Sequence, residues 1–272
     1  MFVIFEAIIL GIIQGLTEFL PISSSGHLIL AEWATGWQGE LMNNLAFDVS
    51  LHVGTLAAVL WYFWRDWLRF GKAVVNVMRG KAPEYEARLV WYIGLATIPA
   101  VIAGMLFERV VETAFRNPLL VCAALVTGSA VMWLSDRYSS KERRLASMTL
   151  GHALLVGAAQ AVALIPGISR SGITISAALA AGYRREDSAR FSFLLSTPVI
   201  GGAALLKLRH ITFQGHAAWG CALGVLSAAV VGYLAIRFLI RYLGRHSLNV
   251  FVWYRLILAG AVIALWAARH RI

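Results

Sequence analysis

Long apolar runs with few charges dominate the pattern of hydrophobic and polar positions along this chain. A helix needs about 20 apolar residues to cross the hydrocarbon core of a bilayer, and these runs reach that length. The pattern therefore predicts an all-α integral membrane protein. Six transmembrane helices are expected, near residues 45–64, 89–107, 118–135, 190–206, 216–236 and 249–268.

Two further apolar segments, 2–36 and 145–183, are interrupted in the middle by Pro, Gly and Ser. The arm after each interruption, HLILAEWATGW or GITISAALAAGY, is too short to cross a bilayer alone. Irregular backbone at membrane depth is tolerated only where protein or a water-filled cavity satisfies its polar groups. Each segment is therefore expected to be re-entrant, a helix–loop–helix that enters and leaves the membrane on the same side.

The two interrupted segments are similar in sequence. Gly11–Ala31 aligns on Gly157–Ala177 without a gap, and the identical pairs include Ser23 with Ser169. The chain thus predicts two repeats, and because each repeat holds three spans, the second should be inverted relative to the first. The expected units are a single membrane domain, 1–272, with repeat one at about 1–137 and repeat two at about 145–272.

Basic residues set the expected orientation in the membrane. The chain has 24 Lys and Arg against 14 Asp and Glu, a formal net charge of +10. In a soluble protein such a charge would point to nucleic acid, but here most Lys and Arg fall in the loops of one side, which marks the cytoplasmic side. We therefore expect membrane lipids and no nucleic acid as partners. Both termini, and the mouth of the first re-entrant loop, are expected outside the cytoplasm.

The two re-entrant loops are expected to meet near the middle of the bilayer in one polar site. Ser23 or Ser24 suits the N-cap of a helix from Ser25, and Ser169 suits the cap of a helix after Arg170. Free backbone N–H groups at a helix start carry partial positive charge and bind anions. Two helix starts, a guanidinium and several hydroxyls therefore predict a phosphate site. Its hydroxyls are those of Ser23, Ser24, Ser25, Ser169 and Ser171.

Arg170 is the charged residue of the second loop, and an arginine at membrane depth needs a partner. Its planar guanidinium suits phosphate oxygens, which it can bind through two parallel hydrogen bonds. The alternative is a purely structural ion pair with Glu18 of the first loop.

The first loop carries Glu18 and His27 at positions where the second loop has Leu and Ile. Binding alone does not need this asymmetry, whereas catalysis needs a nucleophile, a base and an acid. Glu18 shares a helical face with Gln14, four residues earlier. His27 can titrate near neutral pH or attack phosphorus, and Ser24 can attack if His27 or Glu18 takes its proton. The choice of nucleophile stays open.

Three other features carry weaker predictions. Asp48 and His52 lie four residues apart at the start of an apolar run, and either support the site or make helix–helix hydrogen bonds. Arg255, alone in an apolar run, is expected to be structural. The segment WRDWLRFGKAVVNVMRGK has the pattern of a basic amphipathic helix at the membrane surface.

Two stretches of the chain also resemble a known family. QGLTEFLPISSSGH (Gln14–His27) and PGISRSGIT (Pro166–Thr174) closely resemble the two signature motifs of the bacterial undecaprenyl-diphosphate phosphatases, also called bacitracin-resistance proteins. The resemblance runs the length of the chain. It implies hydrolysis of undecaprenyl diphosphate to undecaprenyl phosphate and inorganic phosphate, which recycles the lipid carrier of peptidoglycan synthesis and confers bacitracin resistance.

The resemblance further implies a location in the bacterial inner membrane, where the opening on the outer side would be periplasmic. It implies a divalent cation, Mg²⁺ or Ca²⁺, with Glu18 as its ligand. The acidic motif of the family occurs here in its Gln form, so that Gln14 stands in place of one carboxylate. The implied catalytic residues are Glu18, Ser24, His27 and Arg170, and the substrate-binding residues are Gln14, Ser23, Ser25, Ser169, Ser171 and Thr174.

A different class of protein shares the expected architecture. Inverted repeats with broken helices that meet at the midplane are typical of secondary transporters. An inverted-repeat transporter or a polyprenyl-phosphate flippase is therefore the alternative function. The partner expected for the phosphatase is a polyprenyl diphosphate lipid, and a homodimer stays open.

Overall fold

The structure is a computed structural model that describes residues 2–35, 45–114, 117–208 and 216–270. Within these ranges the chain is helical, and its one β-bridge pairs Arg143 with Tyr183. The prediction of an all-α protein is confirmed. The helices are α1 (Phe2–Phe19), α2 (Ser24–Thr35), α3 (Leu45–Tyr62), α4 (Trp64–Met78), α5 (Tyr85–Ala114), α6 (Pro118–Tyr138), α7 (Leu150–Val162), α8 (Arg170–Ala180), α9 (Arg185–Leu208), α10 (His216–Leu243) and α11 (Asn249–Arg269), with a 3₁₀ turn, η1 (Leu145–Ser147), before α7.

Four of the expected spans are helices that are long and apolar enough to cross a membrane. They are Tyr85–Phe107 of α5, Pro118–Tyr138 (α6), Ala218–Leu243 of α10 and Asn249–Arg269 (α11). The other two expected spans fall in α3, whose apolar part Phe47–Tyr62 is shorter, and in α9. These four helices are what a multi-pass membrane protein requires.

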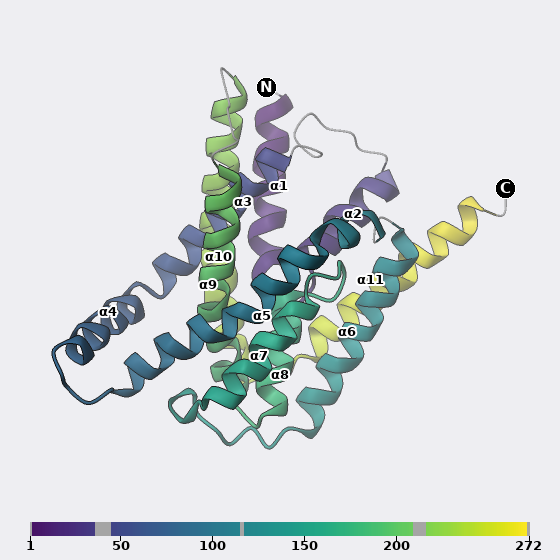
Figure 1. Ribbon diagram of the computed structural model, residues 1–272. Helices are drawn as coiled ribbons and strands as arrows, with labels where there is room; N and C mark the ends of the chain where they lie inside the picture. Colours follow the sequence, from purple (N-terminus) through teal and green to yellow (C-terminus); the bar gives the residue numbers. More distant parts are fainter. Residues whose placement is uncertain (1, 36–44, 115–116, 209–215, 271–272) are drawn as a thin grey trace.

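Each interrupted segment folds as two helices joined by a short connection, residues 20–23 between α1 and α2 and residues 163–169 between α7 and α8 (Figure 1). Each connection is called a turn below. The two connections share one backbone feature, a positive φ at the serine before the second helix: 78° at Ser23 and 73° at Ser169. Each serine caps the helix that follows it. The second arm expected for the first segment ends beyond Thr35, outside the described residues.

Small residues let the helices pack closely around these turns. Helix α1 lies against α10, and α10 lies against α3, as Figure 1 shows. A Cβ on Gly11 would collide with the carbonyl of Gly224, and a Cβ on Gly54 would collide with that of Val225. Such close approach of helix backbones is the usual way that helices associate in lipid. It fixes the position of α1, which carries Gln14 and Glu18.

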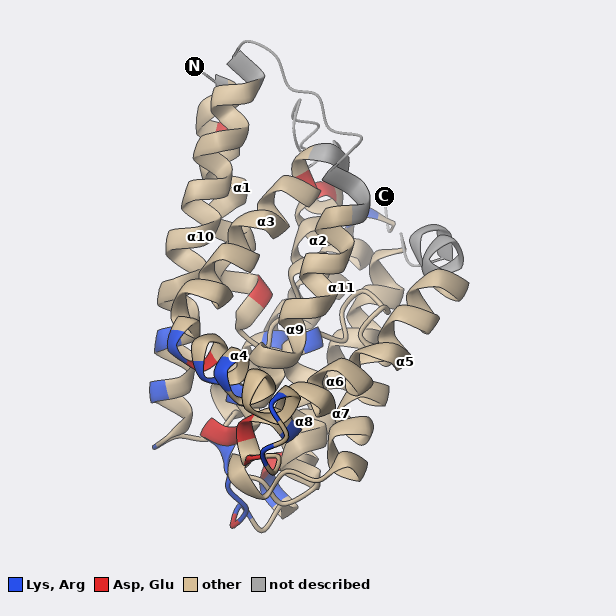
Figure 2. Ribbon diagram, turned by 60° about the vertical axis from the view of Figure 1, so that its left-hand side comes forward, with Lys and Arg blue, Asp and Glu red and all other residues tan. Residues whose placement is uncertain are grey.

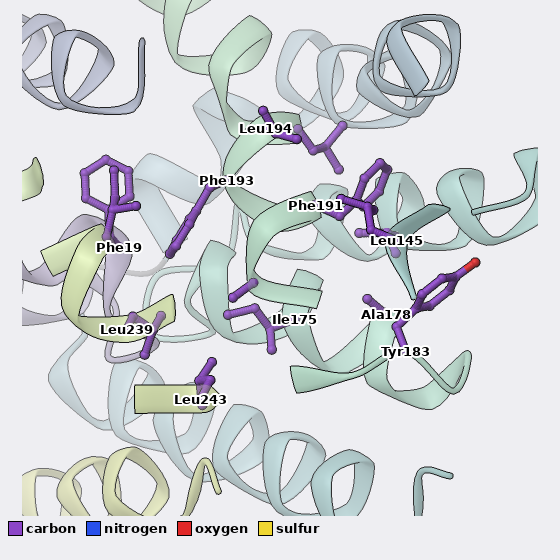
Figure 3. Packing of buried hydrophobic residues seen from close by; sticks show 14 of the residues in the cluster. Phe19, Leu145, Ile175, Ala178, Tyr183, Phe191, Phe193, Leu194, Leu239 and Leu243 are labelled. Atoms are coloured by element: carbon purple, nitrogen blue, oxygen red, sulfur yellow. The ribbon is translucent and has the colours of Figure 1, made fainter. Parts of the chain in front are cut away.

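A hydrophobic cluster supports the inner ends of α1 and α8 (Figure 3). The rings of Phe19 and Phe193 meet edge to face with centroids 5.5 Å apart, an orientation that aromatic pairs prefer. Ile175 of α8 and Leu239 of α10 are fully buried in the same cluster. The residue after Glu18 is therefore anchored in packed apolar protein.

Charge is distributed unevenly along the long axis of the molecule. The two termini lie towards one end, whereas Lys and Arg gather at the other, around α4 and the start of α7 (Figure 2). Two ion pairs stabilise this basic end: Arg185 with Asp136 at 2.6 Å and Arg190 with Asp66 at 2.5 Å. The sequence led us to expect the two termini on the side opposite the loops rich in Lys and Arg, and in the structure the termini and these residues lie at opposite ends.

Candidate active site

Glu18, in the last turn of α1, collects donors from three helices. The amide of Gln14 donates to its Oε2 at 3.1 Å, as the four-residue spacing predicts. The hydroxyl of Ser24, the first residue of α2, donates to the same oxygen at 3.0 Å. Arg170, the first residue of α8, donates through Nη2 to Oε1 at 2.8 Å. The buried carboxylate is thus the point where the two interrupted segments meet.

The Arg170–Glu18 ion pair is almost enclosed, with side chains 16% and 8% exposed. Neither charge would be stable there without a partner. The structural pair considered from the sequence is therefore present. It occupies one of the five N–H donors of the guanidinium, and in the described part of the chain no other hydrogen bond uses its side chain. Arg170 keeps donors for an anion.

Ser23 ties the two turns together. Its Oγ accepts hydrogen bonds from the backbone N–H of Gly26, at 3.3 Å, and from that of Gly167 in the other turn, at 3.2 Å. Ser169 makes the equivalent cap on Gly172 at 3.2 Å. Of the two serines expected to cap the first loop, the structure assigns the cap to Ser23, and the helix begins at Ser24 instead of Ser25.

The remaining hydroxyls expected at the site differ in how they are used. Ser171 donates to the carbonyl of Leu20 at 3.1 Å, and Thr174 shares a 2.6 Å hydrogen bond with Ser192. Both are buried. Ser24 and Ser25, by contrast, reach the surface, with Ser25 exposed. Ser23, Ser169, Ser171 and Thr174 hold the turns in shape. Ser24 and Ser25 are accessible, and Arg170 keeps unused N–H donors, so these three can contact a ligand.

His27 lies one helical turn after Ser24, with both ring nitrogens occupied. Nδ1 lies 2.7 Å from the carbonyl oxygen of Ser23 and Nε2 lies 2.7 Å from the hydroxyl of Tyr254, whose ring stacks on the imidazole. A carbonyl only accepts, so in neutral His27 the proton is on Nδ1, and Tyr254 donates to Nε2. Within the described residues no hydrogen bond joins His27 to Glu18, Ser24 or Arg170.

His52 is a site residue that the sequence ranked low. Its Nε2 lies 3.4 Å from the amide of Gln14 and 3.9 Å from Oε2 of Glu18. Its Nδ1 lies 2.8 Å from the carbonyl of Asp48, which fixes the proton on Nδ1 and leaves Nε2 to accept from Gln14. The sequence signal was the pair Asp48 and His52 at the start of an apolar run. Of its two interpretations, the contacts of His52 with Gln14 and Glu18 agree with support of the site.

Arg255 of α11 forms hydrogen bonds to both turns. Its side chain is fully buried, and no carboxylate of the described residues lies within ion-pair distance. The guanidinium donates instead to backbone carbonyls of both interrupted segments and of α6. The acceptors are Pro21 at 3.3 Å, Gly167 at 2.8 Å, Ile168 at 3.0 Å and Leu125 at 3.1 Å. The sequence predicted a structural role for Arg255 but did not identify these backbone carbonyls as its partners.

The side chains of the site do not form a metal cage by themselves. Among the described residues no group of three or more His, Cys, Asp or Glu could hold a metal ion. Mg²⁺ is commonly held by one or two carboxylates together with phosphate oxygens of the substrate. Glu18 fits such a cation as one ligand of a set that a phosphorylated substrate completes.

Comparison with known proteins gives a consistent result. The family model of bacitracin resistance protein BacA matches residues 7–261, which include every site residue described above. The undecaprenyl-diphosphatase of Desulforudis audaxviator is 48% identical over 261 residues, 96% of this chain and 97% of that protein. The undecaprenyl-diphosphatases of Moorella thermoacetica and Alcanivorax borkumensis are each 47% identical, over 98% and 97% of this chain and 99% of their own lengths.

Proposed function

Because the chain belongs to the bacitracin resistance protein BacA family, we infer that it hydrolyses undecaprenyl diphosphate to undecaprenyl phosphate and inorganic phosphate. The observation that carries this function is the meeting of Glu18, Ser24 and Arg170, from three helices, in one buried polar site. The reaction recycles the lipid carrier of peptidoglycan and other cell-wall polymers. The relatives give no support to the transporter or flippase alternative.

We propose six membrane crossings, by α3, α5, α6, α9, α10 and α11, with the α1–α2 and α7–α8 hairpins re-entrant from opposite sides. The location of both termini at the end opposite the Lys and Arg residues supports this arrangement. In a bacterial inner membrane the site would then open to the periplasmic side. The lipid tail of the substrate stays in the bilayer while its diphosphate reaches the turns.

Phosphoryl transfer depends mainly on positioning and on stabilising negative charge. Arg170 binds the diphosphate through its remaining N–H donors, and the starts of α2 and α8 add partial positive charge. A divalent cation, Mg²⁺ or Ca²⁺, would be held by Glu18 and the substrate phosphates, and would neutralise charge on the diphosphate. His52 and Gln14 fix the orientation of the Glu18 carboxylate.

The geometry favours Ser24 as the nucleophile over His27. The hydroxyl of Ser24 already donates to Glu18, which can take its proton, whereas Nε2 of His27 is occupied by Tyr254. Oγ of Ser24 forms a bond to the terminal phosphorus, and the bridging P–O bond breaks to release undecaprenyl phosphate. Water then attacks the phosphoserine, and the bond between Oγ and phosphorus breaks. Glu18 returns its proton to Oγ of Ser24, and inorganic phosphate leaves with the oxygen and the protons of the water.

The function is tested by phosphate release from undecaprenyl diphosphate by the purified protein in detergent, with Mg²⁺ or Ca²⁺ and with EDTA. We expect release with the cation, loss with EDTA, and recovery when the cation is restored. Absence of release from protein that elutes as a folded species would reject the phosphatase. Transport or flipping of the lipid by that same protein in vesicles would then identify the alternative.

A further inference from the structure

A cavity rimmed by charged side chains lies at the basic end of the molecule, among the residues around α4 that Figure 2 shows in blue and red. It has a volume of about 260 Å³ and is lined by α4, α5, α9 and η1. Its floor is apolar and buried, formed by Phe70, Leu89, Leu145 and Leu194. None of its lining residues belongs to the candidate active site.

The charges around this cavity are balanced but only partly paired. Asp66 and Arg190 form an ion pair at 2.5 Å, which accounts for one charge of each sign. The other four charged groups come from four separate elements, and within the described part of the chain none of them forms an ion pair. These four are Arg69, Glu86, Arg144 and Asp187.

These two cations and two anions line one cavity and form no ion pair with one another, so their charges are available to a ligand. A ligand that carries both a positive and a negative group would complement all four. Burial raises the pKa of the Asp187 carboxyl, although a backbone hydrogen bond from Leu145 and the nearby charge of Arg190 act in the opposite direction. This carboxyl would therefore gain from a cation placed directly against it.

Helix α4 indicates where such a ligand comes from. Its exposed apolar side chains include Leu68, 57% exposed, and Met78, 81% exposed, while Arg65 and Arg69 are on its polar surface. A helix of this kind lies in the headgroup region of a bilayer. The cavity beside it is therefore at the depth of phospholipid headgroups.

We propose that this cavity binds the headgroup of a phospholipid with a primary ammonium, of the phosphatidylethanolamine type. Arg69 and Arg144 bind its phosphate, and Glu86 and Asp187 accept hydrogen bonds from its ammonium. The site is independent of the phosphatase reaction. A choline headgroup has the same charges but no N–H donor, so it loses the contacts to the two carboxylates.

The proposal is tested by the binding of dioleoyl phosphatidylethanolamine and its N-methylated forms to the full-length protein in detergent, measured by native mass spectrometry. We expect the dissociation constant to rise with each methyl group, by about tenfold from ethanolamine to choline. Equal binding of the two lipids, or tighter binding of phosphatidylglycerol, would overturn the proposal. So would binding of soluble glycerophosphoethanolamine as tight as that of the lipid.

Variants of the two carboxylates test whether the preference for ethanolamine over choline lipids arises in this cavity. In Glu86→Gln and Asp187→Asn the difference between ethanolamine and choline lipids should shrink to less than about threefold, since each removes one acceptor charge. Glu84→Gln, an exposed acid close by in the sequence but outside the cavity, should keep the full difference. A full preference in both cavity variants would place the lipid elsewhere. If a variant does not fold, the methylation series on the unaltered protein still decides.

Discussion

At the scale of single residues, the site depends on which donors share the carboxylate of Glu18. Gln14 and Ser24 bind one oxygen, and Arg170 binds the other. The pairing of Gln14 with Glu18 followed from helical spacing. For His52, support of the site was one of two interpretations, and the contact with Tyr254 was not predicted. Their partners lie 38 and 227 residues away in the chain, and no spacing pattern relates them.

Ser24→Ala should lower the turnover number by about a thousandfold, because it removes the attacking oxygen. Ser25→Ala, in the neighbouring serine, should cost at most about tenfold, since that hydroxyl contributes to binding alone. The measurement is the rate of phosphate release at saturating substrate. Turnover by Ser24→Ala within tenfold of the unaltered protein would assign the attack to His27 or to water.

Tyr254→Phe should lower turnover by about tenfold, because it removes the O–H that fixes the His27 ring one helical turn from the attacking Ser24 but keeps the stacked ring. If Tyr254 acts through His27, the double variant with His27→Ala should be no slower than His27→Ala alone. Steady-state rates of the three variants decide this. Losses that multiply in the double variant would show that Tyr254 acts independently of the histidine.

At the scale of elements, one buried arginine binds the two turns, each of which has a serine with positive φ before its second helix. The interruptions by Pro, Gly and Ser were enough to predict two helices in each segment. The positive φ angles of Ser23 and Ser169 were not predictable, because serine seldom adopts them without support from surrounding structure. That support comes from Arg255, whose carbonyl acceptors on the two turns are 234, 88 and 87 residues away.

Gly128→Ala should destabilise the protein by about 1–3 kcal/mol and reduce activity, since the added methyl would collide with the guanidinium of Arg255. Gly260→Ala is the matched control, because a Cβ there meets nothing within 4 Å. Thermal unfolding in detergent and phosphate release give the two readouts. Equal stability of the two variants would contradict the role of Arg255 in holding the turns.

At the scale of the whole molecule, the apolar runs predicted the helices. The distribution of Lys and Arg predicted that the two chain termini lie at the end of the molecule opposite the basic loops. Four runs are helices of spanning length, whereas Phe47–Tyr62 is shorter and α9 contains Pro198 in its interior. Hydropathy alone could not give the packing of α1 on α10 and α3, because that packing depends on glycines at specific contacts.

The orientation is tested with single cysteines in a chain whose Cys122 and Cys221 are replaced by Ala. Glu32→Cys, near the end that holds the termini, should react with a membrane-impermeant maleimide in intact cells. Arg79→Cys, at the basic end, should react only after the membrane is permeabilised. Both residues are exposed, so access depends on the side of the membrane. The reverse pattern would place the opening of the site on the cytoplasmic side.

The measurement that tests the central claim most directly is a double-mutant cycle on Glu18 and Arg170, with both activity and thermal stability as readouts. Glu18→Gln and Arg170→Gln should each lose stability, because each leaves a buried charge without its partner. The double variant should regain stability but not phosphate release, which the account predicts to stay at least about a hundredfold below the unaltered protein. If activity returned together with stability, the pair would be structural only, and the two turns would not form the catalytic site.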